Sequence, residues 1–234
     1  MKFFFDMNIS KLYNIFKEYP SISTDSRNIK KDSIFFALKG ENFNGNKFAK
    51  EALKSGCKYA VIDEKEYKIN ENYILVNNAL KTLQQLASYH RDNINIPIIA
   101  ITGTNGKTTS KELITSCLSS ELETAYTKGN FNNHIGVPLT LLEINKKHEI
   151  GIIEMGANHK NEINFLCEIA KPSYGIITNI GKAHLEGFKN FEGVKSTKKE
   201  LYDFIKKNNG IIFINNDDKT LNEISKNIKS ITYG

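Results

Sequence analysis

The chain has 234 residues, enough for one large domain or two modest ones. Its hydrophobic fraction of 40% and charged fraction of 25% are ordinary for a globular protein, and no apolar run approaches the ~20 residues that span a bilayer. The net charge of +6 suits anionic ligands such as nucleotides, whereas dispersed lysines without interleaved aromatic residues argue against nucleic acid.

The amino terminus and the cysteines indicate a cytoplasmic protein without membrane insertion. The apolar stretch in Met1–Asp6 is too short for a signal peptide. Cys57, Cys117 and Cys167 are far apart and in no metal-like spacing, so we expect reduced, mostly buried thiols. The sequence does not fix the oligomeric state, and a monomer is the expectation.

The first part of the chain alternates short helices and strands, with polar clusters between them at Ser23–Arg27 and Gly40–Asn46. Pro20 ends the first helix, and Gly56 stands where a helix C-terminal glycine belongs. The spacing predicts helices at residues 9–19, 47–55 and 78–93, and strands at residues 33–38, 58–62 and 73–76. A new strand-loop-helix unit then begins, which predicts a domain boundary near residues 92–97.

The second part alternates strand and helix more regularly, which predicts a parallel sheet covered on both faces. We expect strands at residues 98–102, 150–154, 175–179, 210–215 and 231–233, and helices at residues 108–120, 160–170 and 194–207. In the first of these helices, the apolar face is predicted to be Leu113, Ile114, Cys117 and Leu118. The fold class is therefore α/β.

A phosphate-binding loop follows the strand at residues 98–102. The loop has the short form G-x-x-G-K-T, because Ile101 stands where the generic pattern has its first glycine. Its backbone N–H groups and the following helix N-terminus would hold phosphates, Lys107 would reach the β- and γ-phosphates, and Thr108 would ligate Mg²⁺. A surface Gly-Lys turn is disfavoured, because the flanking strand and helix both fit. The predicted ATP-binding residues are Gly103, Thr104, Asn105, Gly106, Lys107, Thr108 and Thr109.

Polar motifs end several of the predicted strands. Because ligands of such sheets lie beyond the carboxyl ends of the strands, we expect these motifs to converge on one edge. They are residues 103–109, 154–157, 178–184 and 215–218. Glu154 is a candidate Mg²⁺ ligand on these grounds, although an ion-paired or helix-capping role would also fit a glutamate there.

In their order along the chain, the motifs resemble those of the Mur ligases of peptidoglycan synthesis. The glycine loop matches the family's T-G-T/S-x-G-K-T, and it is one of six matching segments that occur in the family's order. These segments are Thr24–Arg27, Thr102–Thr108, Gly129–Thr140, Glu154–Asn158, Thr178–Glu186 and Thr197–Glu200. One departure is Asn44-Gly45-Asn46, where the family often has D-G-H.

The resemblance implies an amino-terminal UDP-muramoyl-peptide-binding domain at residues 1–93 and a central P-loop-type ATP-binding domain at residues 94–234. The similarity is greatest to members that join D-alanyl-D-alanine to UDP-N-acetylmuramoyl-tripeptide through an acyl phosphate, with ATP and Mg²⁺. The family carries a third, C-terminal domain, so we expect a central domain that is incomplete at its end and a chain that does not complete ligation alone.

The resemblance also implies site residues. Catalytic roles fall to Lys107, His184 and Lys198, with Lys198 carbamylated. The metal ligands would be Thr108, Glu154, His184 and Lys198, and the substrate-binding residues would be Ser26, Arg27, Asn44, Gly45, Asn132 and Asn133. Without the resemblance, Lys198 reads as part of a solvated basic helix face and His184 as a structural histidine. The remaining histidines are expected to be structural or on the surface, namely His90, His134, His148 and His159.

Three alternatives stay open. A non-ligase ATPase or kinase could carry the same loop, but would have no use for Thr24–Arg27. A sibling Mur ligase could add another amino acid, and a non-catalytic module could hold the ligands without turnover. The sequence does not say whether the third residue of the tripeptide is lysine or diaminopimelate.

Overall fold

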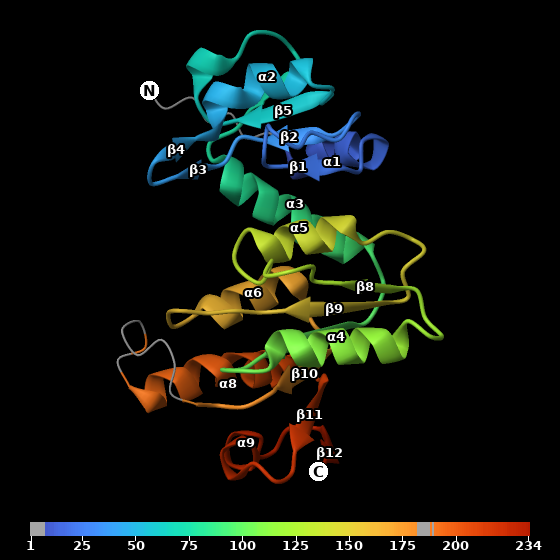
Figure 1. Cartoon of the computed structure of the whole chain (residues 1–234), viewed down its shortest axis with the longest axis vertical. Coiled ribbons are helices and arrows are strands. Elements are labelled where there is room, and N and C mark those ends of the chain that lie inside the picture. Colours follow the sequence, from blue (N-terminus) through green and yellow to red (C-terminus); the bar gives the residue numbers. More distant parts are fainter. Residues whose placement is uncertain (1–7, 182–187, 189) are drawn as a thin grey trace. The chain divides into compact units, whose positions relative to one another are not determined.

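The computed structural model describes residues 8–181, 188 and 190–234, and the chain divides into two compact units, Met1–Asn93 and Ile94–Gly234. Both units are built on parallel sheets with helices, which confirms the predicted α/β class. Figure 1 labels the elements, and each unit is described separately below. Among the described residues, no helix combines the length and apolarity that a membrane crossing requires.

The first unit contains a four-stranded parallel sheet in the order β1-β2-β5-β6 and a small antiparallel hairpin, β3-β4. Buried aromatic and aliphatic side chains fill its core, among them Phe35 and Ile62. The elements are α1 (Ile9–Glu18), β1 (Ile22–Ser23), β2 (Ile34–Phe36), β3 (Lys39–Gly40), β4 (Phe43–Asn44), η1 (Gly45–Phe48), α2 (Ala49–Lys54), β5 (Tyr59–Ile62), η2 (Lys65–Tyr67), β6 (Tyr73–Leu75) and α3 (Ala79–Asn93).

The second unit contains a six-stranded parallel sheet in the order β12-β11-β10-β7-β9-β8. Its elements are β7 (Ile98–Thr102), α4 (Lys107–Leu118), β8 (Thr124–Tyr126), α5 (Gly136–Glu143), β9 (Ile150–Glu154), α6 (Glu162–Ala170), β10 (Tyr174–Ile177), α8 (Phe191–Lys207), β11 (Ile211–Asn215), α9 (Lys219–Ile224) and β12 (Ser230–Tyr233). The first strand, β7, lies between β9 and β10. The order of the strands therefore reverses at β7, and this reversal is where sheets of this class bind ligands.

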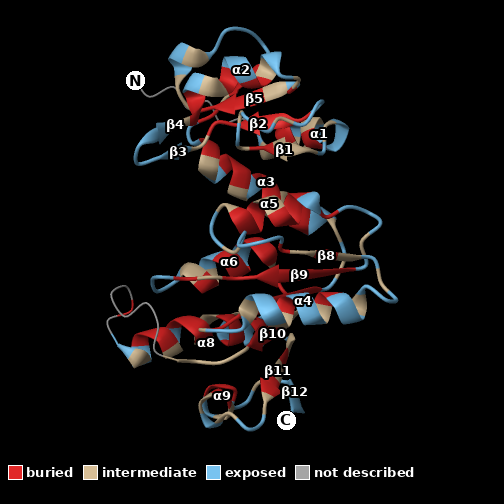
Figure 2. Ribbon diagram, viewed as in Figure 1, coloured by how far each residue is buried: buried red, intermediate tan, exposed pale blue. Residues whose placement is uncertain are grey.

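Helices cover both faces of this sheet. Isoleucines of β7, β9 and β10 on one face pack against Ile114 and Leu118 of α4. On the other face, Leu201 and Ile205 of α8 lie against Gly175 of β10, and α6 contacts both α5 and α8. Strands β7 and β9 are buried along their whole length, as Figure 2 shows for β9. Burial on both faces explains why these strands are continuous apolar runs.

The predicted apolar face of α4 is wrong in part. Ile114 and Leu118 pack on the sheet, but Leu113 is 64% exposed and Cys117 is also exposed. The buried positions of the helix are instead Lys111 and Thr115. The exposure of Cys117 also limits the prediction of buried thiols to Cys57 and Cys167. Lys111 can take a buried position facing the sheet because its ammonium has partners there, as described below.

Short elements were missing from the sequence prediction. β8, α5 and α9 have too few residues for a clear periodicity, and the segment at residues 47–55 begins as the 3₁₀ helix η1 before α2. The longer predicted elements agree with the structure to within three residues at each end.

Candidate functional site

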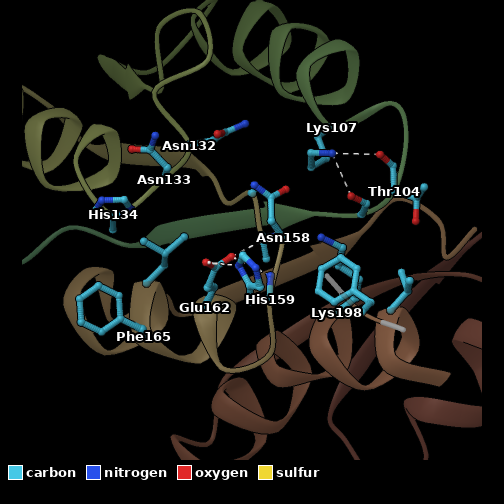
Figure 3. Close-up of a pocket in the computed structure, with 16 residues that line it drawn as sticks. Thr104, Lys107, Asn132, Asn133, His134, Asn158, His159, Glu162, Phe165 and Lys198 are labelled. Atoms are coloured by element: carbon cyan, nitrogen blue, oxygen red, sulfur yellow. Dashed lines mark hydrogen bonds and ion pairs between the residues drawn. The ribbon is translucent and has the colours of Figure 1, made fainter. Parts of the chain in front are cut away.

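The phosphate loop connects β7 to α4 in a conformation that two glycines permit. Gly103 has φ +147° and Gly106, the N-cap of α4, has φ +76°. A methyl group at Gly103 would overlap the Thr178 hydroxyl. The Lys107 ammonium donates to the carbonyl oxygens of Gly103 at 2.9 Å and Thr104 at 3.0 Å (Figure 3). The loop and the start of α4 therefore form one compact turn around the lysine.

The segment that follows β10 holds the loop in place through uncharged groups. The Asn179 side chain donates to the Asn105 carbonyl oxygen at 3.0 Å and accepts from the Asn105 N–H at 3.1 Å. The Thr178 hydroxyl donates to the same carbonyl oxygen at 2.6 Å, and the Gly181 N–H donates to the Thr104 hydroxyl at 2.9 Å. The orientation of the Asn105 peptide is therefore set by β10, which is the neighbouring strand.

Beside the loop, Glu154 lies at the carboxyl end of β9, and the residue is only 1% exposed. One carboxylate oxygen accepts from the Thr108 hydroxyl at 2.9 Å and the other from the Asn132 amide at 2.8 Å. A carboxylate beside a threonine hydroxyl is a hard oxygen donor set that suits Mg²⁺. Among the described residues, no cluster of three or more His, Cys, Asp or Glu could hold a metal. These oxygens thus fit a cation that completes its shell with phosphate and water.

Lys198 of α8 is the second cation of the site. The residue is 3% exposed, and its ammonium lies 5.9 Å from the centre of the Phe188 ring. Burial and then the charge of Lys107 lower the pKa of Lys198 to about 8. Burial also lowers the pKa of Lys107. The prediction of a solvated basic face therefore holds for Lys199, which pairs with Asp203, and not for Lys198.

The opposite wall is the loop from β9 to α6, and carboxylates hold it. Glu162 accepts the N–H groups of Asn158 at 2.6 Å and His159 at 3.0 Å. Although burial raises the pKa of Glu162, these hydrogen bonds and the His159 ring lower it on balance. Glu200 of α8 reaches across to accept the N–H groups of Asn161 at 2.7 Å and Asn164 at 2.9 Å, which caps the start of α6.

These walls enclose a pocket of about 460 Å³. Figure 3 shows Lys107, Thr104 and Lys198 on one side of it, and His134 and Phe165 on the other. The lining residues are Gly103, Thr104, Lys107, Asn132, Asn133, His134, Gly156, Ala157, Asn158, His159, Glu162, Phe165, Leu166, Phe188, Val194 and Lys198. A pocket with two lysines at one end and His134 and Phe165 at the other (Figure 3) fits an anion attached to a larger molecule.

The structure brings some predicted site residues together. Lining the pocket are Gly103, Thr104, Lys107, Asn132, Asn133 and Lys198, while Thr108 and Glu154 meet beside it. Asn105, Gly106 and Thr109 are exposed residues at the start of α4 and do not line it. His184 lies outside the described residues.

The remaining predicted residues belong to the first unit. Arg27 is exposed and pairs with Asp25 at 2.7 Å, a contact that lowers the pKa of Asp25 to about 2. Ser26 is half-buried beside it. Gly45 is buried, and a methyl group there would overlap the Leu38 backbone. The Asn44 side chain accepts from the Asn46 N–H at 3.0 Å and donates to Glu64 at 2.9 Å. In this departure from the family's D-G-H, both asparagine side chains thus donate to carboxylates just after β5, Asn44 to Glu64 and Asn46 to Asp63.

Sequence reasoning missed His134, His159 and Phe165, which line the pocket. Both histidines are exposed, as the sequence analysis expected, but they also line the pocket, which it did not predict. A signal was present, because His134 lies inside a family motif and His159 stands between Glu154 and Glu162. Phe165 carried no such signal.

Comparisons with known proteins agree with this geometry. The family model described as "Mur ligase family, catalytic domain" matches residues 18–98, and "Mur ligase middle domain" matches residues 101–234. A UDP-N-acetylmuramoyl-tripeptide–D-alanyl-D-alanine ligase of Haemophilus influenzae is 40% identical over 213 residues, which cover 89% of this chain and 46% of that protein.

Solved structures show the same similarity. MurF from Acinetobacter baumannii superposes with a TM-score of 0.82 at 35% identity, covering 92% of this chain and 48% of that one. MurF from Thermotoga maritima, crystallised in complex with ADP, gives a TM-score of 0.81 at 31% identity, covering 92% and 50%. The chain spans about half the length of these relatives. The resemblance in the sequence motifs is confirmed: the chain belongs to the Mur ligase family.

Proposed function

We propose that residues 94–234 bind ATP with Mg²⁺ in the pocket and that the protein joins D-alanyl-D-alanine to UDP-N-acetylmuramoyl-tripeptide. The observation that carries the proposal is the meeting of Lys107, which belongs to a phosphate loop, with the buried Lys198 in one pocket. Relatives at 40% identity carry the name of this ligase, and a structural neighbour was crystallised with ADP.

Two anions must approach one another in this reaction, and the pocket supplies the opposing charge. In the proposed first step, the carboxylate of the tripeptide attacks the γ-phosphoryl group of ATP, giving an acyl phosphate and ADP. The amine of D-alanyl-D-alanine then attacks the acyl carbon, loses a proton and displaces phosphate. Lys107 would offset the negative charge of both substrates, Lys198 in its carbamate form (see below) would help to hold Mg²⁺, and the amides of Asn132 and Asn158 would orient the carboxylate.

Mg²⁺, when bound, would neutralise charge on the β- and γ-phosphates. Thr108 and Glu154 would hold it, with His184 as a further proposed ligand. For Lys198 we propose a carbamate in the active protein, since the lowered pKa leaves part of the amine neutral and able to add CO₂. NMR of the protein in isotopically labelled bicarbonate tests this point, because a carbamate on Lys198 would give a signal that Lys198→Met lacks.

The first unit would bind the UDP-sugar end of the substrate. Arg27 is exposed and carries the planar guanidinium that suits a diphosphate, so we place the diphosphate near it together with Ser26. Asn44 and Gly45 remain proposed neighbours of that site. We further propose action in the cytoplasm as a monomer, which sedimentation of the purified protein can test.

The experiment is a calorimetric titration of the chain with MgATP, followed by mass spectrometry after addition of both substrates. Lys107→Ala should abolish detectable ATP binding, whereas Lys199→Ala, which alters a half-buried lysine outside the pocket lining, should bind as the wild type does. A wild-type chain that fails to bind MgATP would refute the proposal. Binding of the nucleotide and the UDP-sugar without amide formation is the result expected if this chain alone does not complete ligation, and amide product would show that it does.

A further inference from the structure

A second lysine of α4 is buried away from the pocket. Lys111 is fully buried, and its ammonium donates to the Thr127 carbonyl oxygen at 2.6 Å. The same ammonium pairs with Glu112 at 2.8 Å and lies 5.9 Å from the centre of the Tyr126 ring. Lys111 does not line the pocket. A buried lysine is rare unless its charge is paired, so this position requires an explanation.

Thr127, the residue that Lys111 holds, directly follows β8 and is itself fully buried. Its N–H donates to the Ile152 carbonyl oxygen at 3.0 Å, which continues the pairing of β8 with β9. Its hydroxyl accepts from the Glu154 N–H at 3.0 Å. Thr127 thus joins Lys111 on one side to the backbone of Glu154 on the other.

The connection closes on the helix from which it started. The Glu154 carboxylate accepts from Thr108, which lies one helical turn before Lys111 in α4. The circuit therefore runs from Lys111 through Thr127 and Glu154 to Thr108. Each step is a hydrogen bond between 2.6 and 3.0 Å.

We propose that Lys111 is a positioning residue for the Thr108–Glu154 pair, acting through Thr127. Lys111 fixes the end of β8 against α4 and thereby sets the position of the Glu154 carboxylate relative to the Thr108 hydroxyl. This position in turn sets the affinity of the site for Mg²⁺ in the presence of the nucleotide. The inference rests on the proposed binding of ATP with Mg²⁺ at this pair.

The chemistry explains why lysine suits this position. The Thr127 carbonyl is buried and points at α4, so an apolar side chain at position 111 would leave it without this donor. The lysine stem spans the distance from the helix, and its charge is partly offset by the exposed Glu112. The segment after Thr127 also carries Asn132, whose amide binds the other Glu154 oxygen. Lys111 therefore holds the first residue of the segment from Thr127 to Asn132, and both of these residues bind Glu154.

The test compares ADP binding with Mg²⁺ and with a chelator, by calorimetry on the 234-residue chain. Lys111→Met retains the apolar stem and removes the donor. We expect it to weaken Mg²⁺-dependent ADP binding about 10- to 100-fold, the range found when groups supporting metal ligands are removed. Binding of ADP without Mg²⁺ should change little, because the phosphate loop does not depend on Thr127.

Two controls separate positioning from general damage. Thr115→Val alters the other buried position of α4, four residues further on, and should leave Mg²⁺ dependence unchanged. Thr127→Val removes the hydroxyl that binds the Glu154 N–H and should reproduce the loss, whereas Thr127→Ser should retain wild-type binding. Thermal unfolding of each variant reports whether it folds. If Lys111→Met does not fold, the comparison of Thr127→Val with Thr127→Ser tests the positioning role instead.

The outcomes distinguish the inference from the function on which it rests. The positioning role alone would be overturned if ADP binding by Lys111→Met depended on Mg²⁺ as much as binding by the wild type does. If Lys111→Met does not fold, the same result for Thr127→Val would overturn it. An equal loss with and without Mg²⁺ would also overturn it, because a general structural role would act in that way. A wild-type chain whose ADP binding ignores Mg²⁺ would overturn the proposed function and the inference together.

Discussion

The two walls of the pocket are held by different kinds of group. On the phosphate-loop side, uncharged groups of Thr178 and Asn179 bind the loop backbone. On the opposite side, the carboxylates of Glu162 and Glu200 bind the backbone N–H groups around the start of α6. The loop side also holds two lysines whose pKa values are lowered by burial, Lys107 and Lys198 (Figure 3), whereas the second side is held by carboxylates. High pH should therefore act on the loop side through the lysines, and low pH should act on the second side through the carboxylates.

The largest expected effect breaks the loop wall. Gly103→Ala should destabilise the protein by about 3 kcal/mol or more, because the added methyl group overlaps Thr178 and the φ of +147° is strained for alanine. Gly106→Ala is the matched control. Its φ is +76° with no atom within 4 Å of the new methyl group, so we expect a loss of about 1 kcal/mol.

Urea denaturation followed by circular dichroism measures both glycine variants. The difference between them should reflect the contact with Thr178, since both variants retain Lys107. Equal losses from the two substitutions would show that the contact with Thr178 does not hold the loop.

The next effect concerns Lys198 and depends on pH. A lysine whose pKa falls from 10.5 to about 8 on folding costs about 3 kcal/mol while it stays protonated. The cost is fully present below pH 8, and it disappears as the pH rises to 10.5, because the unfolded chain binds more protons in that window. Lys198→Met should therefore be about 3 kcal/mol more stable than the wild type at pH 7, with the gain vanishing near pH 10.5.

Urea denaturation from pH 7 to pH 10.5 tests the sign, with the half-buried, ion-paired Lys199→Met as the control. A gain in Lys198→Met that does not shrink as the pH rises would mean that packing, and not the buried charge, controls stability around Lys198.

How much of this contrast could be predicted from the sequence depends on how far apart the interacting residues lie along the chain. The phosphate loop was predicted because its glycines, lysine and flanking strand are local features of the sequence. The burial of Lys198 was not predictable from periodicity, since its neighbours Lys195 and Lys199 look equivalent in sequence and only packing separates them. Lys111 was missed for the same reason, because its partner Thr127 belongs to another strand-loop segment.

Long-range hydrogen bonds were equally invisible in the sequence. Glu200 caps α6 from another helix, whereas the N-cap residue of α6, Asn161, makes no side-chain capping bond of its own. Nothing in the local pattern around Asn161 indicates such a partner. The roles proposed for individual site residues, including His184, remain predictions.

A smaller effect is expected from removing that cap. Glu200→Ala leaves the N–H groups of Asn161 and Asn164 without their acceptor, and it should cost about 1–2 kcal/mol. Lys199→Ala, which removes only a surface pair with Asp203, should change stability by less than about 0.5 kcal/mol. Hydrogen exchange of the α6 amides measures the loss locally, and unchanged protection at Asn161 and Asn164 would contradict the capping role.

The smallest effect compares buried hydroxyl groups on the two helices. Thr115 of α4 is 6% exposed, and within the described part of the chain its hydroxyl has no hydrogen-bond partner. Thr197 of α8 is fully buried, and its hydroxyl donates to the Gly193 carbonyl oxygen at 2.9 Å. Valine has nearly the shape of threonine, so each substitution isolates the hydroxyl. Thr115→Val should stabilise the protein by about 1 kcal/mol, because it removes a buried polar group without a partner.

Thr197→Val should instead be neutral or cost up to about 1 kcal/mol, since a satisfied hydrogen bond is lost. The sign of the difference between the two variants is the informative quantity, and thermal unfolding of both at one pH measures it. Destabilisation by Thr115→Val would mean that water reaches this hydroxyl, and the inner face of α4 would then be wetter than its burial indicates. Stabilisation would show that α4 tolerates one unsatisfied group at Thr115, one turn after the position where Lys111 is fully partnered.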